Sequence, residues 1–112
     1  MSNLVYFVSS DKLGGQDPDL GQVLMRNFFL TLVDAEELPT HIMFVERGVQ
    51  LLQAEAQTIE AMSMLQKKGV KLLACLTCLN FYGIADKLQA GEVTNMATII
   101  QTMHQADKVI SL

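Results

Sequence analysis

Short apolar runs that alternate with helical patterns constrain the fold of this chain more than any other feature. Each run is almost continuously apolar, which is typical of a parallel strand that is buried on both faces. The segments between the runs repeat apolar residues every three or four positions, which predicts helices with one buried face. Because strands and helices alternate, we predict a three-layer α/β/α fold with a mainly parallel sheet, formed by residues 1–112 as a single domain.

Local signals set the predicted boundaries. Asp17 and Pro18 are typical of a helix start, Gly69 of the left-handed position after a helix, and Thr94 of a helix N-cap. We predict strands over 4–8, 41–45, 70–74 and 107–112, helices over 17–34 and 55–68, and a short helix that breaks near Gly83. An amphipathic helix that contains Met96 and Met103 should follow Thr94, with loops at 9–16, at 46–49 and around Gly91 and Glu92. The carboxyl ends of parallel strands share one edge of a sheet, where ligands bind in such folds. The first two loops and the end of the third strand should therefore surround one site.

Charge and hydropathy exclude two classes of partner. The chain has a net charge of −4 and no run of Lys or Arg, so nucleic-acid binding is not expected. No apolar run approaches the roughly 20 residues that span a membrane, and residues 1–8 resemble a strand more than a signal peptide. We therefore expect a cytoplasmic protein without a membrane partner. Half of the residues are hydrophobic, which is a large share for a small domain, so we expect a homo-oligomer.

The two cysteines, Cys75 and Cys78, lie where the third predicted strand gives way to a helix. Free backbone N–H groups and the positive end of a helix dipole stabilise a thiolate at such a junction, so the thiol pKa should fall below about 8.5. We predict that Cys75 is the nucleophile and that Cys78, one turn further on, is a resolving thiol. In a cytosolic chain, two cysteines at this spacing favour thiol, redox or metal chemistry over a structural disulfide.

Three other interpretations of the cysteine pair stay open to different degrees. Free cysteines are often buried simply as small apolar side chains. A thioredoxin-like motif has the same spacing but comes early in its domain, whereas this pair lies two-thirds of the way along the chain. A zinc site requires four ligands, and His41 and His104 are far from the pair in sequence. We therefore predict no metal and no other cofactor.

Several other residues near the predicted edge are candidates for binding. Ser10 and Asp11 belong to the loop after the first strand, where backbone amides can bind an anion or substrate. Gly48 lies in the loop after the second strand, Thr77 lies between the cysteines, and Asn95 belongs to a segment that can brace the cysteine turn. Solvated turns and helix capping explain such residues equally well.

Five stretches of the chain resemble the DsrE/DsrF/TusD-like family, and most closely the DsrE-like domain of YedF-type proteins. The stretches are 10–14, 20–25, 44–49, 75–83 and 91–96. The resemblance implies a flavodoxin-like three-layer fold, frequent homo-oligomerisation and a role in sulfur relay, with a link to selenium metabolism in the YedF group. One departure is Leu76, because that group tends to have glycine after the first cysteine.

The resemblance also implies a role for one cysteine. In the TusD-like branch, a cysteine eight residues before a glycine carries sulfur as a persulfide, and Cys75 stands in this relation to Gly83. Sulfur donor and acceptor proteins are the implied partners, with a TusA-like protein as one candidate. The leading hypothesis is a sulfurtransferase-like carrier. The alternatives are a non-enzymatic oligomeric binding module with structural cysteines and a dithiol redox switch, so whether the protein is catalytic stays open.

Overall fold

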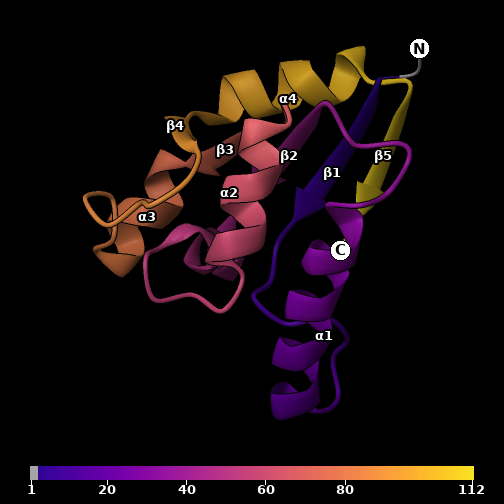
Figure 1. The fold of residues 1–112 in the computed structure, drawn as a ribbon. Coiled ribbons are helices and arrows are strands. Elements are labelled where there is room, and N and C mark those ends of the chain that lie inside the picture. The colour runs from indigo at the N-terminus through magenta and orange to yellow at the C-terminus, as the bar shows by residue number, and fades with distance from the viewer. Residues whose placement is uncertain (1–2) are drawn as a thin grey trace.

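The computed structural model describes residues 3–112, which form a sheet covered by helices (Figure 1). The strands are β1 (Leu4–Val8), β2 (His41–Phe44), β3 (Lys71–Cys75), β4 (Glu92–Thr94) and β5 (Lys108–Ser111). The helices are α1 (Pro18–Leu32), the 3-10 helix η1 (Glu46–Leu52), α2 (Ile59–Lys67), α3 (Leu76–Tyr82) and α4 (Met96–Gln105).

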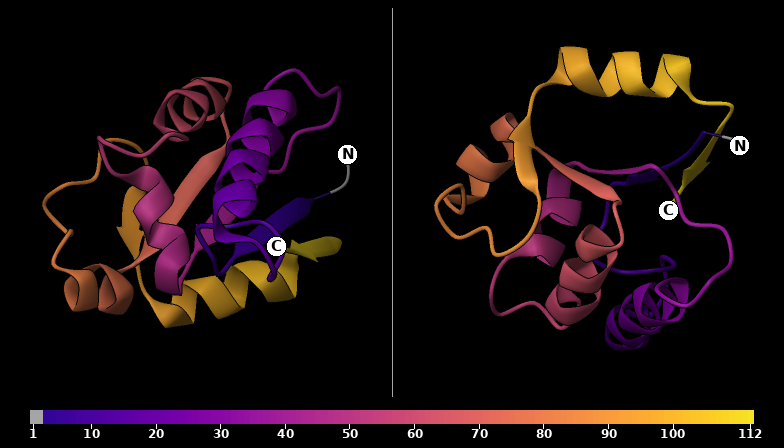
Figure 2. Two further views of the ribbon diagram at one scale, coloured as in Figure 1. Left: turned by 90° about the horizontal axis from the view of Figure 1, so that it is seen from below. Right: turned by 45° about the horizontal axis from the view of Figure 1, so that its top comes forward.

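All of these strands run parallel, in the order β4-β3-β2-β1-β5. Helices α1 and α2 cover one face of the sheet, and α4 crosses the opposite face (Figure 2). The predicted three-layer α/β/α fold with a parallel sheet is thus confirmed. The parallel arrangement places the 9–16 loop, η1 and the start of α3 at the same edge of the sheet, because each follows the carboxyl end of a strand.

Successive side chains of β1, β2 and β3 enter two different apolar clusters. The larger cluster fills the space between the sheet and the helices α1 and α2, and it includes Tyr6, Val8, Met25, Phe29, Ile42, Phe44, Met62, Leu65 and Leu72. The smaller cluster lies on the face that α4 covers and consists of Val5, Met43, Leu73, Cys75 and Ile99. This alternation explains why the sequences of β1, β2 and β3 are almost continuously apolar, because both faces of these strands are buried.

The segment after β2 differs from the predicted loop. Residues 46–52 form the 3-10 helix η1, and α2 starts at Ile59 rather than at residue 55. The buried hydroxyl of Thr58 donates a hydrogen bond of 2.8 Å to the Leu51 carbonyl, which ties the segment before α2 back to η1. This contact between two segments overrides the helical pattern of residues 55–58.

The segment before α4 also differs. Residues 92–94, predicted as the end of a loop and a helix cap, form the short strand β4, which pairs with β3 so that Thr94 lies opposite Cys75. The N-cap of α4 is Asn95, whose side chain accepts a hydrogen bond of 2.9 Å from the Thr98 N–H. The predicted cap at Thr94 is therefore wrong by one residue. Among the helices of residues 3–112, none has the length and apolarity needed to cross a membrane.

Candidate functional site

The cysteine pair lies at the junction that the sequence predicts. Strand β3 ends at Cys75, α3 starts at Leu76, and Gly83 ends that helix in the left-handed conformation, with φ of +67°. Both cysteines are free thiols. Cys75 is only 2% exposed and belongs to the smaller apolar cluster, whereas Cys78 is partly exposed and packs against both clusters.

A backbone N–H group points at the sulfur of Cys78. The N–H of Glu46, the first residue of η1, donates a hydrogen bond of 3.0 Å to Cys78 Sγ. Glu46 has a φ of +49°, which is unfavourable for a residue with a side chain by about 1–2 kcal/mol. A non-glycine residue in this conformation is therefore held there by its surroundings.

Packing at the end of β1 explains this conformation. The Val45 N–H donates to the Val8 carbonyl at 3.0 Å, and the Gly48 N–H donates to the Val45 carbonyl at 2.9 Å. A Cβ atom at Gly48 would lie 2.3 Å from the Val8 carbonyl oxygen, so only glycine permits this approach. The chain must therefore turn sharply at Glu46, and the turn directs the Glu46 N–H toward Cys78.

The pKa of the Cys78 thiol is raised above its ordinary value. Burial is the largest cause, and the hydrogen bond from the Glu46 N–H acts in the opposite direction. A hydrogen bond with Cys75, together with the charges of Cys75 and Glu46, adds to the increase in pKa. Cys78 therefore rests as a neutral thiol at neutral pH, and the lowered thiol pKa predicted from the sequence is wrong for this cysteine because burial outweighs the backbone donor.

Cys78 opens into an apolar cavity of about 400 Å³. Its lining residues are Glu46, Thr77, Cys78, Phe81 and Tyr82. The Phe81 ring is 83% exposed and packs edge-to-face on Tyr82, with 5.2 Å between the ring centroids. Exposed aromatic surface beside a reactive side chain is typical of a place where a partner binds. An atom added to Cys78 Sγ has room in this cavity.

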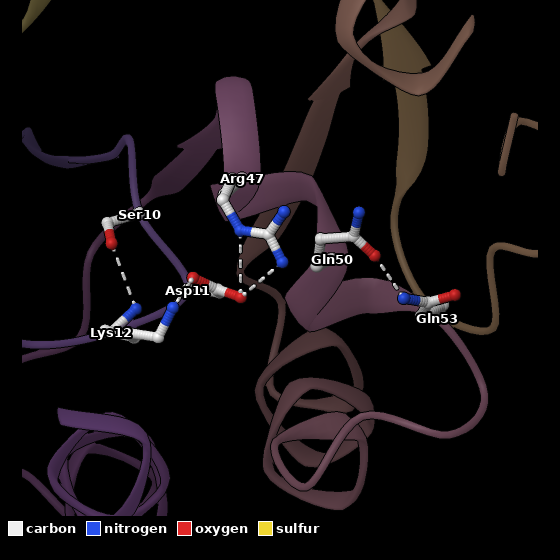
Figure 3. A network of polar contacts seen from close by, with 6 residues as sticks. All are labelled: Ser10, Asp11, Lys12, Arg47, Gln50 and Gln53. Carbon is white, nitrogen blue, oxygen red and sulfur yellow. Dashed lines mark hydrogen bonds and ion pairs between the residues drawn. The ribbon is translucent and has the colours of Figure 1, made fainter. Parts of the chain in front are cut away.

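A polar network links the loop after β1 to the same region (Figure 3). Arg47 donates to Asp11 Oδ2 from Nη2 at 3.1 Å and from Nε at 3.3 Å, and this contact raises the pKa of Arg47. The guanidinium of Arg47 also lies over the Tyr82 ring, 5.7 Å from its centroid. Through Arg47, the loop after β1 thus supports the aromatic wall of the cavity at Cys78.

A second cavity, of about 290 Å³, is lined in part by Arg47 and is mostly polar. Its lining includes Asp11, Arg47 and the amides of Gln50 and Gln53, which are hydrogen-bonded to each other (Figure 3). These groups offer both donors and acceptors for a polar ligand.

The predicted binding residues have different positions in the structure. Asp11 belongs to the polar network, and Thr77 lines the cavity at Cys78. Ser10 accepts a hydrogen bond of 3.0 Å from the Lys12 N–H, Gly48 permits the close packing of η1, and Asn95 caps α4. Their role in binding therefore stays a prediction.

The structure adds three groups that the sequence interpretation did not single out. They are the backbone N–H of Glu46, the Arg47 guanidinium and the Tyr82 ring. The direction of a backbone N–H cannot be predicted from a pattern of residue types. The one available signal for Arg47 was its place after the second strand, at the edge where ligands bind. Within residues 3–112, no three His, Cys, Asp or Glu side chains are grouped so that they can hold a metal ion.

Comparisons with known proteins agree with this architecture. The model of the DsrE/DsrF-like family matches residues 22–112. The crystal structure of the YchN protein from E. coli is similar with a TM-score of 0.76 and 16% identity, and each chain covers 100% of the other. A protein of unknown function from Methanobacterium thermoautotrophicum, MTH1491, is similar with a TM-score of 0.73 and 20% identity, again over 100% of both chains. None of the curated proteins compared with the chain matches it.

Proposed function

Because this chain belongs to the DsrE/DsrF-like family, we propose that it is a cytoplasmic sulfur-relay protein that carries sulfane sulfur as a persulfide on Cys75. The observation that carries the proposal is a pair of free thiols three positions apart, one buried and one partly exposed, at the carboxyl edge of a parallel sheet. The relation of Cys75 to Gly83, which ends α3, is the relation of the persulfide cysteine in the TusD-like branch.

Burial suits Cys75 for storage. In loading, a cysteine thiolate attacks the terminal sulfur of a donor persulfide, the donor S–S bond breaks, and the donor leaves as a thiol after it takes up a proton. A persulfide on Cys75 would lie among the apolar side chains of Val5, Met43 and Leu73, away from thiols in solution. Release reverses these events, because an acceptor thiolate attacks the terminal sulfur and Cys75 is the leaving group.

The test is the intact mass of the reduced protein after incubation with a cysteine desulfurase and free cysteine. We expect one added sulfur atom, which peptide fragmentation assigns to Cys75. Cys75→Ser should lose the stable adduct, and Cys78→Ser should keep it with altered turnover. If the wild-type chain gains no mass, and both thiols react with an alkylating reagent only after unfolding, the pair is structural and the protein is a binding module.

The donor and acceptor are proposed to be proteins, with a TusA-like protein as the first acceptor to test. Selenium can take the place of sulfur in the same exchange. Supplying selenocysteine with a selenocysteine lyase and comparing the two mass increments under equal conditions separates the two cargoes. Faster loading from the selenium donor would assign the protein to selenium metabolism.

A dithiol redox switch is a second candidate, and the position of two free cysteines within the first turn of α3 favours it. In this function an oxidant converts the two thiols into a disulfide, and a cellular dithiol restores them. Equilibration with glutathione buffers gives the reduction potential of the pair. A potential within the cytosolic range of about −220 to −320 mV, without persulfide formation, would select the switch over the carrier.

A further inference from the structure

The two cysteines differ in how accessible they are to a large partner. Cys75 is 2% exposed and belongs to an apolar cluster beneath α4. Cys78 is partly exposed, lines the cavity of about 400 Å³ and contacts both apolar clusters. The persulfide of a donor protein therefore reaches Cys78 first, because Cys78 lines the cavity and Cys75 does not.

From this arrangement, we propose that Cys78 is the entry and exit port of the site: it takes sulfur from the persulfide of a donor protein and passes it inward to Cys75. The inference rests on the proposed sulfur-carrier function and adds a route to it. Cys78 then touches the reacting atoms in both directions of transfer, whereas the resolving role predicted from sequence would bring it in only at release.

The route consists of two balanced exchanges. First, the Cys78 thiolate attacks the terminal sulfur of the donor persulfide, the donor S–S bond breaks, and the donor leaves as a thiol with one proton. Second, the Cys75 thiolate attacks the terminal sulfur now held on Cys78, the Cys78 S–S bond breaks, and Cys78 becomes a thiolate again. No oxidant or reductant is consumed, because one sulfane sulfur moves between thiols of equal oxidation state. Release to an acceptor thiol runs the two exchanges in reverse.

Three contacts fit this route. Cys78 packs against the apolar cluster that contains Cys75, so the second exchange needs no large movement. The Glu46 N–H, 3.0 Å from Cys78 Sγ, stabilises the thiolate that forms there each time the S–S bond breaks. The cavity beside Phe81 and Tyr82 leaves room for the terminal sulfur and for the end of the donor side chain.

A time course of loading by a cysteine desulfurase tests the route directly. Trypsin leaves both thiols on one peptide, residues 72–87, so fragmentation between Cys75 and Cys78 must locate the added sulfur. Samples are quenched with an alkylating reagent that caps the persulfides. In the wild-type chain we expect the adduct on Cys78 at the earliest times and on Cys75 later.

Two variants separate entry from storage. Cys78→Ser keeps a hydrogen-bond acceptor for the Glu46 N–H but has no thiol, and we expect it to slow the loading of Cys75 by about tenfold or more, because rates of sulfur exchange depend on access. Cys75→Ser should show only a short-lived adduct on Cys78. Circular dichroism and melting temperature establish that each variant is folded, and if one is not, the wild-type time course decides alone.

The outcomes distinguish the route from the carrier function. Loading of Cys75 in Cys78→Ser at the wild-type rate, or a wild-type adduct that appears on Cys75 with none on Cys78 before it, overturns the route and leaves the carrier function intact. An adduct that stays on Cys78 overturns the inward transfer. A wild-type chain that gains no sulfur overturns both proposals.

Discussion

At the scale of single residues, the site depends on a contrast between two thiols that are three positions apart. Cys75 is buried in the apolar cluster between the sheet and α4, whereas Cys78 lines a cavity and accepts a hydrogen bond from the Glu46 N–H. The position of the pair was predictable because an apolar strand and a following helix are local signals. The different surroundings were not, because they depend on η1, which comes from a distant part of the sequence.

The raised pKa of Cys78 predicts how its reactivity depends on pH. We expect the rate of alkylation of Cys78 in the folded protein to rise with a midpoint above about 8.5, the value of a free thiol. Because the folded pKa is the higher one, the contribution of this thiol to stability is present below the unfolded value and is lost as the pH rises through the folded value. Alkylation followed by fragmentation of residues 72–87 measures the midpoint.

Unfolded protein is the control for this pH dependence. In denaturant the Cys78 thiol should titrate near 8.5, so the difference between its folded and unfolded midpoints isolates the effect of the fold. A folded midpoint at or below the unfolded one would show that the Glu46 N–H outweighs the burial of Cys78.

At the scale of elements, η1 sets the geometry of the site although it contributes little of the chemistry. It packs against the end of β1 through Gly48 and places Glu46 and Arg47 beside α3. The sequence predicted a loop here because a short 3-10 helix has no apolar repeat that is long enough to recognise. Strand β4 was missed for a similar reason, since three residues are too few to show an alternating pattern.

Gly48→Ala is the sharpest test of this element. The added Cβ would lie 2.3 Å from the Val8 carbonyl oxygen, so backbone must move, and we expect the free energy of unfolding to fall by about 1–3 kcal/mol. Chemical denaturation measures the change. Gly15→Ala is the matched control, because no atom lies within 4 Å of its added Cβ and the change should be within about 0.5 kcal/mol. Equal stability of the two variants would contradict the packing described for η1.

At the scale of the whole molecule, the two faces of the sheet are covered unequally. Within residues 3–112, helices α1 and α2 cover one face and α4 crosses the other (Figure 2). On that side, Met96 of α4 is 53% exposed and Ile100 is 45% exposed. The alternation of strands and helices was sufficient to predict the layers and the parallel sheet. The alternation did not indicate which face of the sheet is covered by fewer helices, because that depends on the order of the strands.

These exposed side chains give the expected homo-oligomer a specific surface. We propose that copies of the chain associate through α4, and that Ile100→Glu lowers the molar mass measured by size-exclusion chromatography with light scattering, because burial of the new charge is unfavourable. Gln101→Glu places the same charge at the neighbouring exposed position and should leave the molar mass unchanged. A wild-type chain that is already monomeric, or equal effects of the two variants, would rule out this surface.

Cys78 packs against the apolar clusters on both faces of the sheet. Substitutions at position 78 are therefore limited both by the proposed chemistry of the thiol and by the volume that the two apolar clusters leave for a side chain. A larger or smaller side chain at position 78 requires the side chains on both faces of the sheet to be repacked. Redesign of this thiol and redesign of the apolar core are one task here.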